Sequence, residues 1–423
     1  MRRKTASSGP EEKALAHRIG NRSRRAWLAL SVLAALLALP SAAPRAQEPA
    51  AAAVKIGFLG QQVKREAPQP YLDPPPADDG VAGARLGIAD DNTTGRFTGQ
   101  QFSLVEALVP EGGDVAAAFR KLVADGAKLV VTDLPEAPLL AVAALPEAHD
   151  VTLFNTAAPD DDLRADKCRA NLLHTMPSRA MLADALLEYL MVKQWRNVFL
   201  VVGPTDGDRA YAAAMKRSIA KFGAKLVAEK PWTYQPGSKR SDTGHYAIGE
   251  EVANFTQGVS YDVLIVADED DQFGDFVSYS TYTPRPVAGT QGLVPTAWAR
   301  PHQEWGAIQL QDRFRRADKR WMTVHDYTAW LAVRAVGEAA ARAQTIEPDK
   351  VMAFMRSDQF ELGGYKGTPL SFRAWDGQMR QAILLADARA LVSVSPPPGR
   401  FLHQVSELDT LGIDRPETKC HLK

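Results

Sequence analysis

The sequence predicts an α/β protein with two lobes, each a parallel β-sheet flanked by α-helices. Short apolar segments alternate with amphipathic helical segments about every 25 residues, which is typical of βα repeats and leads to parallel sheets. This pattern restarts after residues 172–177. The chain has 423 residues, and single domains usually hold about 100–200. Two lobes are therefore expected.

The first run of elements begins with an apolar strand at 54–60, followed by a helix from Val81. Asn92 and Gly95 are expected to end this helix because both tolerate positive φ. A strand begins at Phe102. The further elements expected in this run are a helix at 115–124, a strand at 129–131, a helix at 139–149 and a strand at 151–154.

The second run follows the same alternation. Its expected elements are a helix at 181–192, a strand at 197–202, a helix at 210–222, a strand at 225–227, a helix at 247–256 and a strand at 261–267. A Pro/Gly/Ser-rich connection at 236–244 interrupts it.

Residues 1–47 read as a secretory signal peptide. Basic Arg22, Arg24 and Arg25 precede an apolar run at 26–39, and small residues follow it, as in the three regions of such a signal. The run is too short to span a bilayer. The paired arginines leave general secretory and twin-arginine export both open. Either route places the mature protein in the periplasm.

Charge and cysteine content fit an exported soluble protein. Removing residues 1–46 takes nine basic and two acidic residues from 50 of each, which leaves 41 basic and 48 acidic. A mildly acidic protein is a poor partner for nucleic acid or an anionic membrane. The two cysteines, Cys168 and Cys420, are expected to form a disulfide that ties the tail to the body, since disulfides persist outside the cytoplasm. Two buried free thiols are the alternative.

Catalytic motifs are absent from the sequence: there is no P-loop, GxGxxG, GxSxG or HExxH. His325, Asp326 and Tyr327 adjoin, and a polar cluster at a helix start explains them better than acid–base chemistry does. We expect neither enzymatic activity nor a cofactor.

Several weak signals follow one another along 54–390. They are Asp90, Asp91 and Asn92 before the turn at Gly95, the aromatic-rich start of a long helix at 321–330, and the hairpin-like segment 363–372 followed by 375–381. In this order they resemble the periplasmic leucine/isoleucine/valine-binding family. The nearest branch resembles binding proteins linked with pyrroloquinoline-quinone (PQQ)-dependent alcohol dehydrogenase systems.

The resemblance implies the two-lobe type I periplasmic binding protein fold, with the ligand held in a cleft between the lobes. Three hinge crossings are expected near 173–178, 287–298 and 346–351, which permit hinge closure. The implied division is a signal peptide at 1–47, the N-terminal lobe at 48–174 and 293–347, and the C-terminal lobe at 175–292 and 348–423.

Four loops at the carboxyl ends of strands are the expected ligand site, because open α/β sheets bind ligands there. In relatives, a serine and backbone amides hold a ligand carboxylate, whereas this chain has Glu136 near the serine position. The expected ligand-binding residues are Glu136, Ala137, Asn155, Thr156, Ala157, Asp206, Tyr211, Asp268 and Glu269.

Ligand chemistry stays open from the sequence. Glu136, Asp268 and Glu269 are expected to face one cleft and repel a free carboxylate. The acidic loop at 268–275 suits a cation, a metal ion or an amine. Alternatively, Glu136 and the acidic loop are solvated helix N-termini, where acidic residues are stabilising without a ligand.

The function implied is that of the substrate-binding component of an ABC transporter. It would be a monomer that captures a small molecule and delivers it to an inner-membrane permease. The alternative is a periplasmic ligand sensor or accessory protein of a PQQ-dependent alcohol oxidation system, which binds a metal ion or an alcohol-derived ligand. The sequence does not separate the two, because one cleft serves both.

Overall fold

The computed structural model describes residues 52–63, 75–233 and 248–422. The expected signal peptide and the Pro/Gly/Ser-rich connection lie outside these ranges. No helix in the described ranges is long and apolar enough to cross a membrane.

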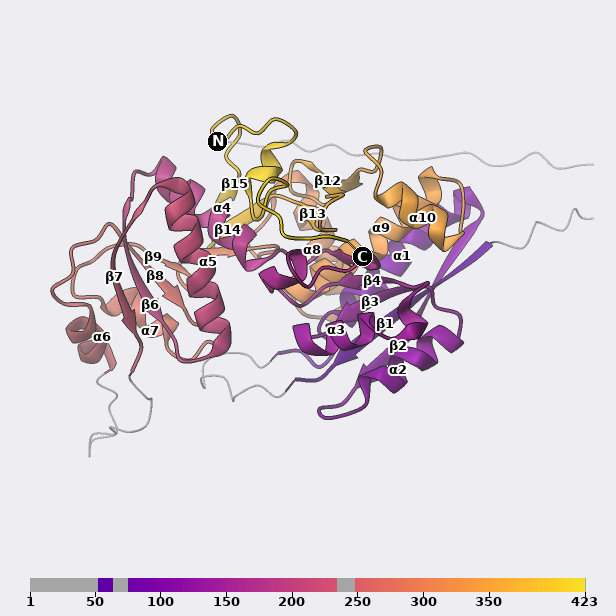
Figure 1. Cartoon of the computed structure of the whole chain (residues 1–423), viewed down its shortest axis with the longest axis horizontal. Helices are drawn as coiled ribbons and strands as arrows, with labels where there is room; N and C mark the ends of the chain where they lie inside the picture. The colour runs from indigo at the N-terminus through magenta and orange to yellow at the C-terminus, as the bar shows by residue number, and fades with distance from the viewer. Residues whose placement is uncertain (1–51, 64–74, 234–247, 423) are drawn as a thin grey trace, which may run out of the picture. The chain divides into compact units, whose positions relative to one another are not determined.

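The first sheet has five parallel strands in the order β2-β1-β3-β4-β5 (Figure 1). Its strands are β1 (Ala52–Gln61), β2 (Gln100–Val109), β3 (Leu129–Asp133), β4 (Thr152–Asn155) and β5 (Leu172–His174). The helices of this run are α1 (Val81–Thr98), α2 (Val115–Ala124) and α3 (Glu136–Ala143). Fully buried strands such as β3 are near-continuous apolar runs because helices cover both faces of a parallel sheet.

The expected end of α1 was wrong. The helix continues past Asn92 and Gly95 to Thr98, and Gly99 provides the left-handed cap at φ 69°. Gly95 is needed for close approach instead, since a Cβ there would lie 2.1 Å from the carbonyl oxygen of Gln100. The Asn92 side chain joins the helix to β2 by bonding both the N–H and the C=O of Phe102, at 2.8 and 2.9 Å.

The helix expected at 139–149 was also misplaced. α3 begins at Glu136 because Pro138 is tolerated within a first helical turn. It ends at Ala143, before Pro146, which starts the short 3₁₀ turn Pro146–Ala148. A proline disfavours helical conformation in the residue before it.

The second sheet has four parallel strands in the order β7-β6-β8-β9. These are β6 (Asn197–Val202), β7 (Lys225–Pro231), β8 (Val263–Ala267) and β9 (Val287–Gly289). Its helices are α4 (Arg179–Val192), α5 (Asp206–Phe222), α6 (Ile248–Thr256) and α7 (Gly274–Ser280).

Two small antiparallel sheets complete the described strands. One joins β10 (Val294–Thr296), β14 (Ile383–Ala386) and β15 (Leu391–Ser395), and the other joins β11 (Leu362–Gly363), β12 (Pro369–Phe372) and β13 (Met379–Arg380). The expected hairpin at 363–372 is thereby confirmed. The remaining α-helices are α8 (Ala307–Asp318), α9 (Val324–Arg342) and α10 (Pro348–Met355).

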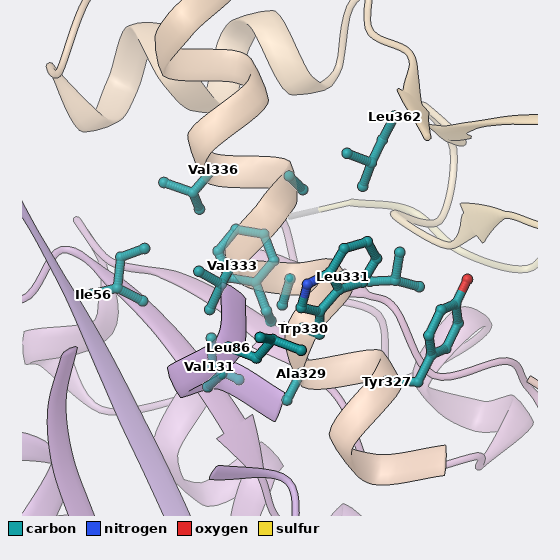
Figure 2. Packing of buried hydrophobic residues seen from close by; sticks show 14 of the residues in the cluster. Ile56, Leu86, Val131, Tyr327, Ala329, Trp330, Leu331, Val333, Val336 and Leu362 are labelled. Atoms are coloured by element: carbon teal, nitrogen blue, oxygen red, sulfur yellow. The ribbon is translucent and has the colours of Figure 1, made fainter. Parts of the chain in front are cut away.

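Two groups of buried side chains surround the two parallel sheets. The first core includes Ile56, Val131, Trp330 and Val333, where α9 packs on α1 and the first sheet (Figure 2). The second core surrounds β6 and β8. A Cβ on Gly83 of α1 would lie 1.8 Å from a backbone oxygen of α9, so glycine permits this contact.

The lobe boundaries stay a prediction, and core membership bears on one of them. Val351 and Met355 of α10 belong to the first core, as does Met379. Ile383, in contrast, packs with Met181 of α4. We therefore propose that the third crossing lies between Met379 and Ile383, later in the chain than 346–351.

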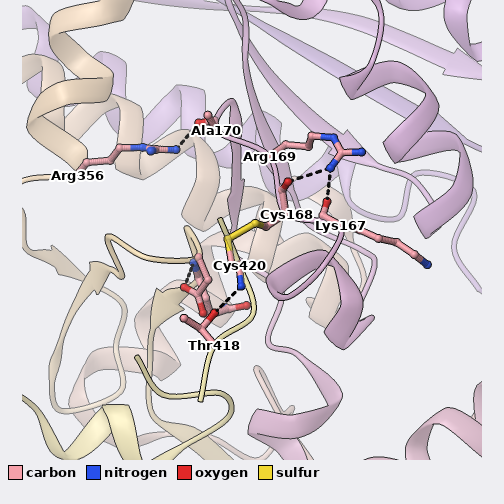
Figure 3. Close-up of a disulfide and its surroundings, with 9 residues drawn as sticks. Lys167, Cys168, Arg169, Ala170, Arg356, Thr418 and Cys420 are labelled. Atoms are coloured by element: carbon pink, nitrogen blue, oxygen red, sulfur yellow. Dashed lines mark hydrogen bonds between the residues drawn. A yellow bond between two sulfur atoms is a disulfide. The ribbon is translucent and has the colours of Figure 1, made fainter. Parts of the chain in front are cut away.

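The expected disulfide between Cys168 and Cys420 is confirmed, with the two Cα atoms 5.7 Å apart (Figure 3). It joins residues 252 positions apart in the sequence.

Candidate functional site

Arg179 links the loops that follow β4 and β8, which belong to different sheets. Its Nε and Nη2 donate to both carboxylate oxygens of Glu269 at 2.8 and 2.7 Å. Its Nη1 donates to Asp160 at 2.7 Å. The Arg179 side chain is 9% exposed, and the two carboxylates are about a quarter exposed. We call Asp160, Arg179 and Glu269 the edge network.

The charges of the edge network stabilise one another. Burial raises the pKa of Glu269, and the bonded guanidinium of Arg179 opposes that rise. Burial lowers the pKa of Arg179, but the two carboxylates outweigh burial and raise it overall. The paired geometry between the Arg179 guanidinium and the Glu269 carboxylate is of the strong bidentate kind.

The sequence analysis did not identify Arg179. One signal was available: Arg179 is the first residue of α4, after the N-cap Ser178. A cation is unfavourable at a helix N-terminus because of the helix dipole. An arginine there indicates nearby carboxylates, although not which ones.

Asp268 holds the acidic loop in shape. Its carboxylate accepts from the backbone N–H groups of Gln272, Phe273 and Gly274 at 3.0, 2.8 and 2.7 Å. Burial raises its pKa, and these N–H groups oppose the rise. The side chain is buried, and two of these bonds go to Phe273 and Gly274, where α7 begins. The role that the structure gives Asp268 is thus structural.

Glu136 and Ala137 begin α3. The Glu136 carboxylate accepts from the Lys167 ammonium at 2.8 Å, and the same lysine lies 3.1 Å from Asp162. Ala137 is exposed. Glu136 and Glu269 each have a cationic partner, so their repulsion of an anion is weaker than that of bare carboxylates. Selection against free carboxylates stays a prediction with less physical support.

Asn155 and Thr156 are buried at the end of β4, and their side chains hold the turn that follows. The Asn155 amide donates to the Ala158 carbonyl at 2.8 Å and accepts from the Ala157 and Ala158 N–H groups at 3.2 and 2.9 Å. The Thr156 hydroxyl donates to the Thr132 carbonyl at 3.1 Å. These bonds fix the backbone of the loop that carries Ala157 and leads to Asp160.

Asp206 and Tyr211 both lie on α5 but in opposite surroundings. The Asp206 side chain is 99% exposed and pairs with Arg209. Tyr211 is buried, and its hydroxyl has no hydrogen-bond partner among the described residues. Burial raises the pKa of Tyr211, and the negative charge of Glu269 raises it further.

The polar cluster at 325–327 starts a helix, as expected. Asp326 and Thr323 form a capping box at the start of α9. His325 lies 2.9 Å from the Asp133 carboxylate at the end of β3. Across the described ranges, no group of three or more His, Cys, Asp or Glu side chains is arranged to hold a metal ion.

The family model described as periplasmic binding protein matches residues 74–242. No curated protein matches the sequence. Solved structures do match. A periplasmic binding protein from Burkholderia mallei is 17% identical, with a TM-score of 0.60, and the match covers 88% of this chain and 100% of that one.

The descriptions of two further structures name amino acids. The leucine-, isoleucine-, valine-, threonine- and alanine-binding protein of Brucella ovis, in a closed conformation, is 13% identical with a TM-score of 0.61, covering 79% of this chain and 89% of its own. An ABC transporter substrate-binding protein of Desulfitobacterium hafniense in complex with leucine is 18% identical with a TM-score of 0.60, covering 80% and 98%. At these identities the structures establish the fold: two parallel sheets flanked by helices, as in type I periplasmic binding proteins. The fold expected from the resemblance is confirmed, and the PQQ-linked branch stays a prediction.

Proposed function

We propose that this chain, a periplasmic binding protein by fold and family match, is the substrate-binding component of an ABC transporter. It captures a small molecule between its two parallel-sheet lobes and delivers it to a membrane permease. The matched family and solved structures are binding proteins, which supports a role without catalysis.

The observation that carries this proposal is the edge network. Asp160 follows β4 of the first sheet and Glu269 follows β8 of the second, and one guanidinium bonds both. The carboxyl ends of strands are where open α/β sheets bind ligands. A ligand that engages both loops would change the contacts of Arg179, and this links binding to the relative position of the sheets.

The ligand contacts we propose follow from which groups are already used. The side chains of Asp268, Asn155 and Thr156 are already bonded to the backbone of their loops. These residues would therefore contribute to ligand binding by positioning backbone groups. For direct contact we propose the Tyr211 hydroxyl, which has no partner among the described residues, and the exposed Asp206, whose ion pair with Arg209 a ligand could exchange. A buried hydroxyl without a partner is costly, and a ligand acceptor would offset that cost.

A thermal-shift screen tests the function. The panel holds branched-chain and other amino acids, alcohols, organic acids, quinone cofactors and metal ions. A ligand at 100 times its dissociation constant stabilises the folded state by about 2.7 kcal/mol. We expect one chemical class to raise the melting temperature, and calorimetry then measures its affinity.

Arg179→Met tests the site, with Arg120→Met as its matched control. Arg120 lies on α2 and forms an exposed ion pair with Glu147, whereas Arg179 joins both loops. We expect Arg179→Met to change the affinity at least tenfold and Arg120→Met to leave it unchanged. Equal affinity in both variants would refute the proposed site. Ligand uptake by cells with and without the gene separates transport from sensing.

A further inference from the structure

The C-terminal tail, which we define as residues 396–422, leaves β15 and runs back over the molecule (Figure 1, yellow). β15 belongs to the sheet with β14 and β10, and this sheet packs against α4 of the second run of elements. The tail thus starts on the side of the second core.

Within the tail, residues 410–412 are bonded to α4 and α5. The Thr410 hydroxyl donates to Glu188 at 2.7 Å, and the Gly412 N–H donates to Asp184 at 2.8 Å. The Lys221 ammonium bonds both Asp184 and the Thr410 carbonyl, at 2.8 and 2.7 Å. Asp184 and Glu188 are both buried on α4. This part of the tail is therefore fixed to the second core.

The neighbouring residue, Asp409, is bonded to two arginines that adjoin the first core. Its carboxylate accepts from Arg373 at 2.9 Å and from Arg380 at 2.8 Å. Arg373 follows β12 and Arg380 ends β13, the strands whose Phe372 and Met379 belong to the first core. Arg373 also donates to the Leu411 carbonyl at 2.7 Å. Four successive residues, 409–412, thus contact groups from both cores.

The disulfide joins the end of the tail to the segment before β5 of the first sheet (Figure 3). Cys168 lies between Leu163 and Leu172, which belong to a separate buried cluster that includes residues of the first sheet. The tail therefore begins beside the second core, contacts both cores in its middle and is covalently joined at its end to the part of the chain that carries the first sheet.

The tail lies beside two of the segments that we propose connect the lobes, near 173–178 and between Met379 and Ile383. His174 and Gln378 form a parallel β-bridge, and the Gln381 side chain donates to the Thr175 carbonyl at 2.7 Å. Arg373 and Arg380 flank this pairing in the sequence. Hinge motion requires such segments to change their backbone angles, and any rotation here would stretch contacts that the tail makes on both sides.

We propose that the C-terminal tail is a brace between the lobes, which restricts the amplitude of hinge motion. This rests on the proposed two-lobe function, because a brace is meaningful only if the lobes move. The bonds at Asp409, Thr410 and Gly412 hold the tail in place, and the disulfide prevents its release.

Pulsed electron resonance on the full mature chain tests the brace. Spin labels attached to unnatural amino acids at the exposed Ala124 of α2 and Ala213 of α5 report the distance between the two runs of elements without added cysteines. We compare the wild type with the double substitution Cys168→Ser and Cys420→Ser, and with Asp409→Asn added to it. Arg400→Met, an exposed change in the tail, is the control.

We expect the width of the distance distribution to increase at least about twofold in the triple variant, and less in the double variant, because hinge motion is then freed. The control should match the wild type. Equal widths in all variants would overturn the brace. If the triple variant does not fold, Cys168→Ser and Cys420→Ser with Thr410→Val provides the same comparison with a smaller loss. These measurements need no ligand, so a failed brace and a failed ligand screen are distinguishable outcomes.

Discussion

The edge network and the C-terminal tail both join groups from the two cores, but they differ in exposure and in number of bonds. Arg179 is bonded to two carboxylates that are about a quarter exposed. Arg373 and Asp409 are 1% and 0% exposed, and Arg373 also bonds backbone carbonyls of the tail. The tail adds a disulfide, and the edge network has no covalent link.

Exposure decides which of the two connections a ligand can change. Water and ions reach the carboxylates of the edge network and screen them, so a ligand group can compete there. A fully buried pair with satisfied hydrogen bonds does not exchange partners at small cost. We therefore regard the edge network as adjustable and the tail as fixed, and the following predictions test that contrast.

The largest effect is expected at Arg373. Arg373→Met leaves the Asp409 carboxylate buried with Arg380 as its remaining cation and removes the donors to Leu408 and Leu411. Removing one partner of a buried ion pair costs about 3–5 kcal/mol of unfolding free energy. Urea unfolding measures this loss of unfolding free energy.

Arg400→Met is the matched control for this variant, because Arg400 is an exposed arginine of the same tail. We expect its midpoint to stay at the wild-type value. A similar midpoint for Arg373→Met would show that the buried pair adds no stability and that the tail is no more fixed than the edge network.

The buried carboxyl of Glu188, which bonds the tail, leads us to predict that the stability of the folded state depends on pH. Burial raises the pKa of Glu188 from 4.5 to about 7, with Asp184 raising it further and Lys221 opposing the rise, as do the hydroxyls of Ser395 and Thr410. The folded state therefore favours the protonated acid. The resulting stability is fully present below pH 4.5 and is lost as the pH rises through about 7.

In Glu188→Gln this loss should disappear. The difference in unfolding free energy between variant and wild type should change by about 2–3 kcal/mol between pH 4.5 and 8, in favour of the variant at high pH. Glu417→Gln, an exposed carboxyl of the tail, is the control and should follow the wild type. Parallel curves for all three proteins would contradict the raised pKa.

A smaller effect is expected at the edge network. Arg179→Met leaves Asp160 and Glu269 partly exposed, so water solvates them in part, and we expect a loss of about 2 kcal/mol. Unlike the loss for Arg373→Met, it should shrink between 0.05 and 1 M salt, roughly by half, because salt screens exposed charges. Urea unfolding at both salt concentrations checks this. A loss that is independent of salt would place the edge network in the same class as the tail.

Local patterns predicted the elements better than the contacts between them. The expected helix at 115–124 and strand at 197–202 match α2 and β6 in full, because their apolar spacing and flanking residues are local signals. The end of α1 was missed because Gly95 serves a close approach to β2, a tertiary requirement that no local pattern contains.

The candidate site shows the same limit. The disulfide followed from two cysteines in a chain that is expected to be exported. The role of Arg179, in contrast, depends on its bonds to Glu269, which lies 90 residues away in the sequence. The sequence indicated the carboxylates of these loops but not their partners, and the partners decide whether a carboxylate is available to contact a ligand.

The smallest effect on stability is expected at Asp206, and this makes it the sharpest test of a ligand role. Its side chain is 99% exposed and its one ion pair is with Arg209, three residues along the same helix. Such pairs add little, so Asp206→Asn should leave the urea midpoint unchanged. Once the ligand screen has identified a ligand, calorimetry measures its affinity for the variant. A fall in affinity with an unchanged midpoint would establish direct contact, because no loss of structure could account for it. An unchanged affinity would remove Asp206 from the site and leave Tyr211 as the one proposed contact on α5.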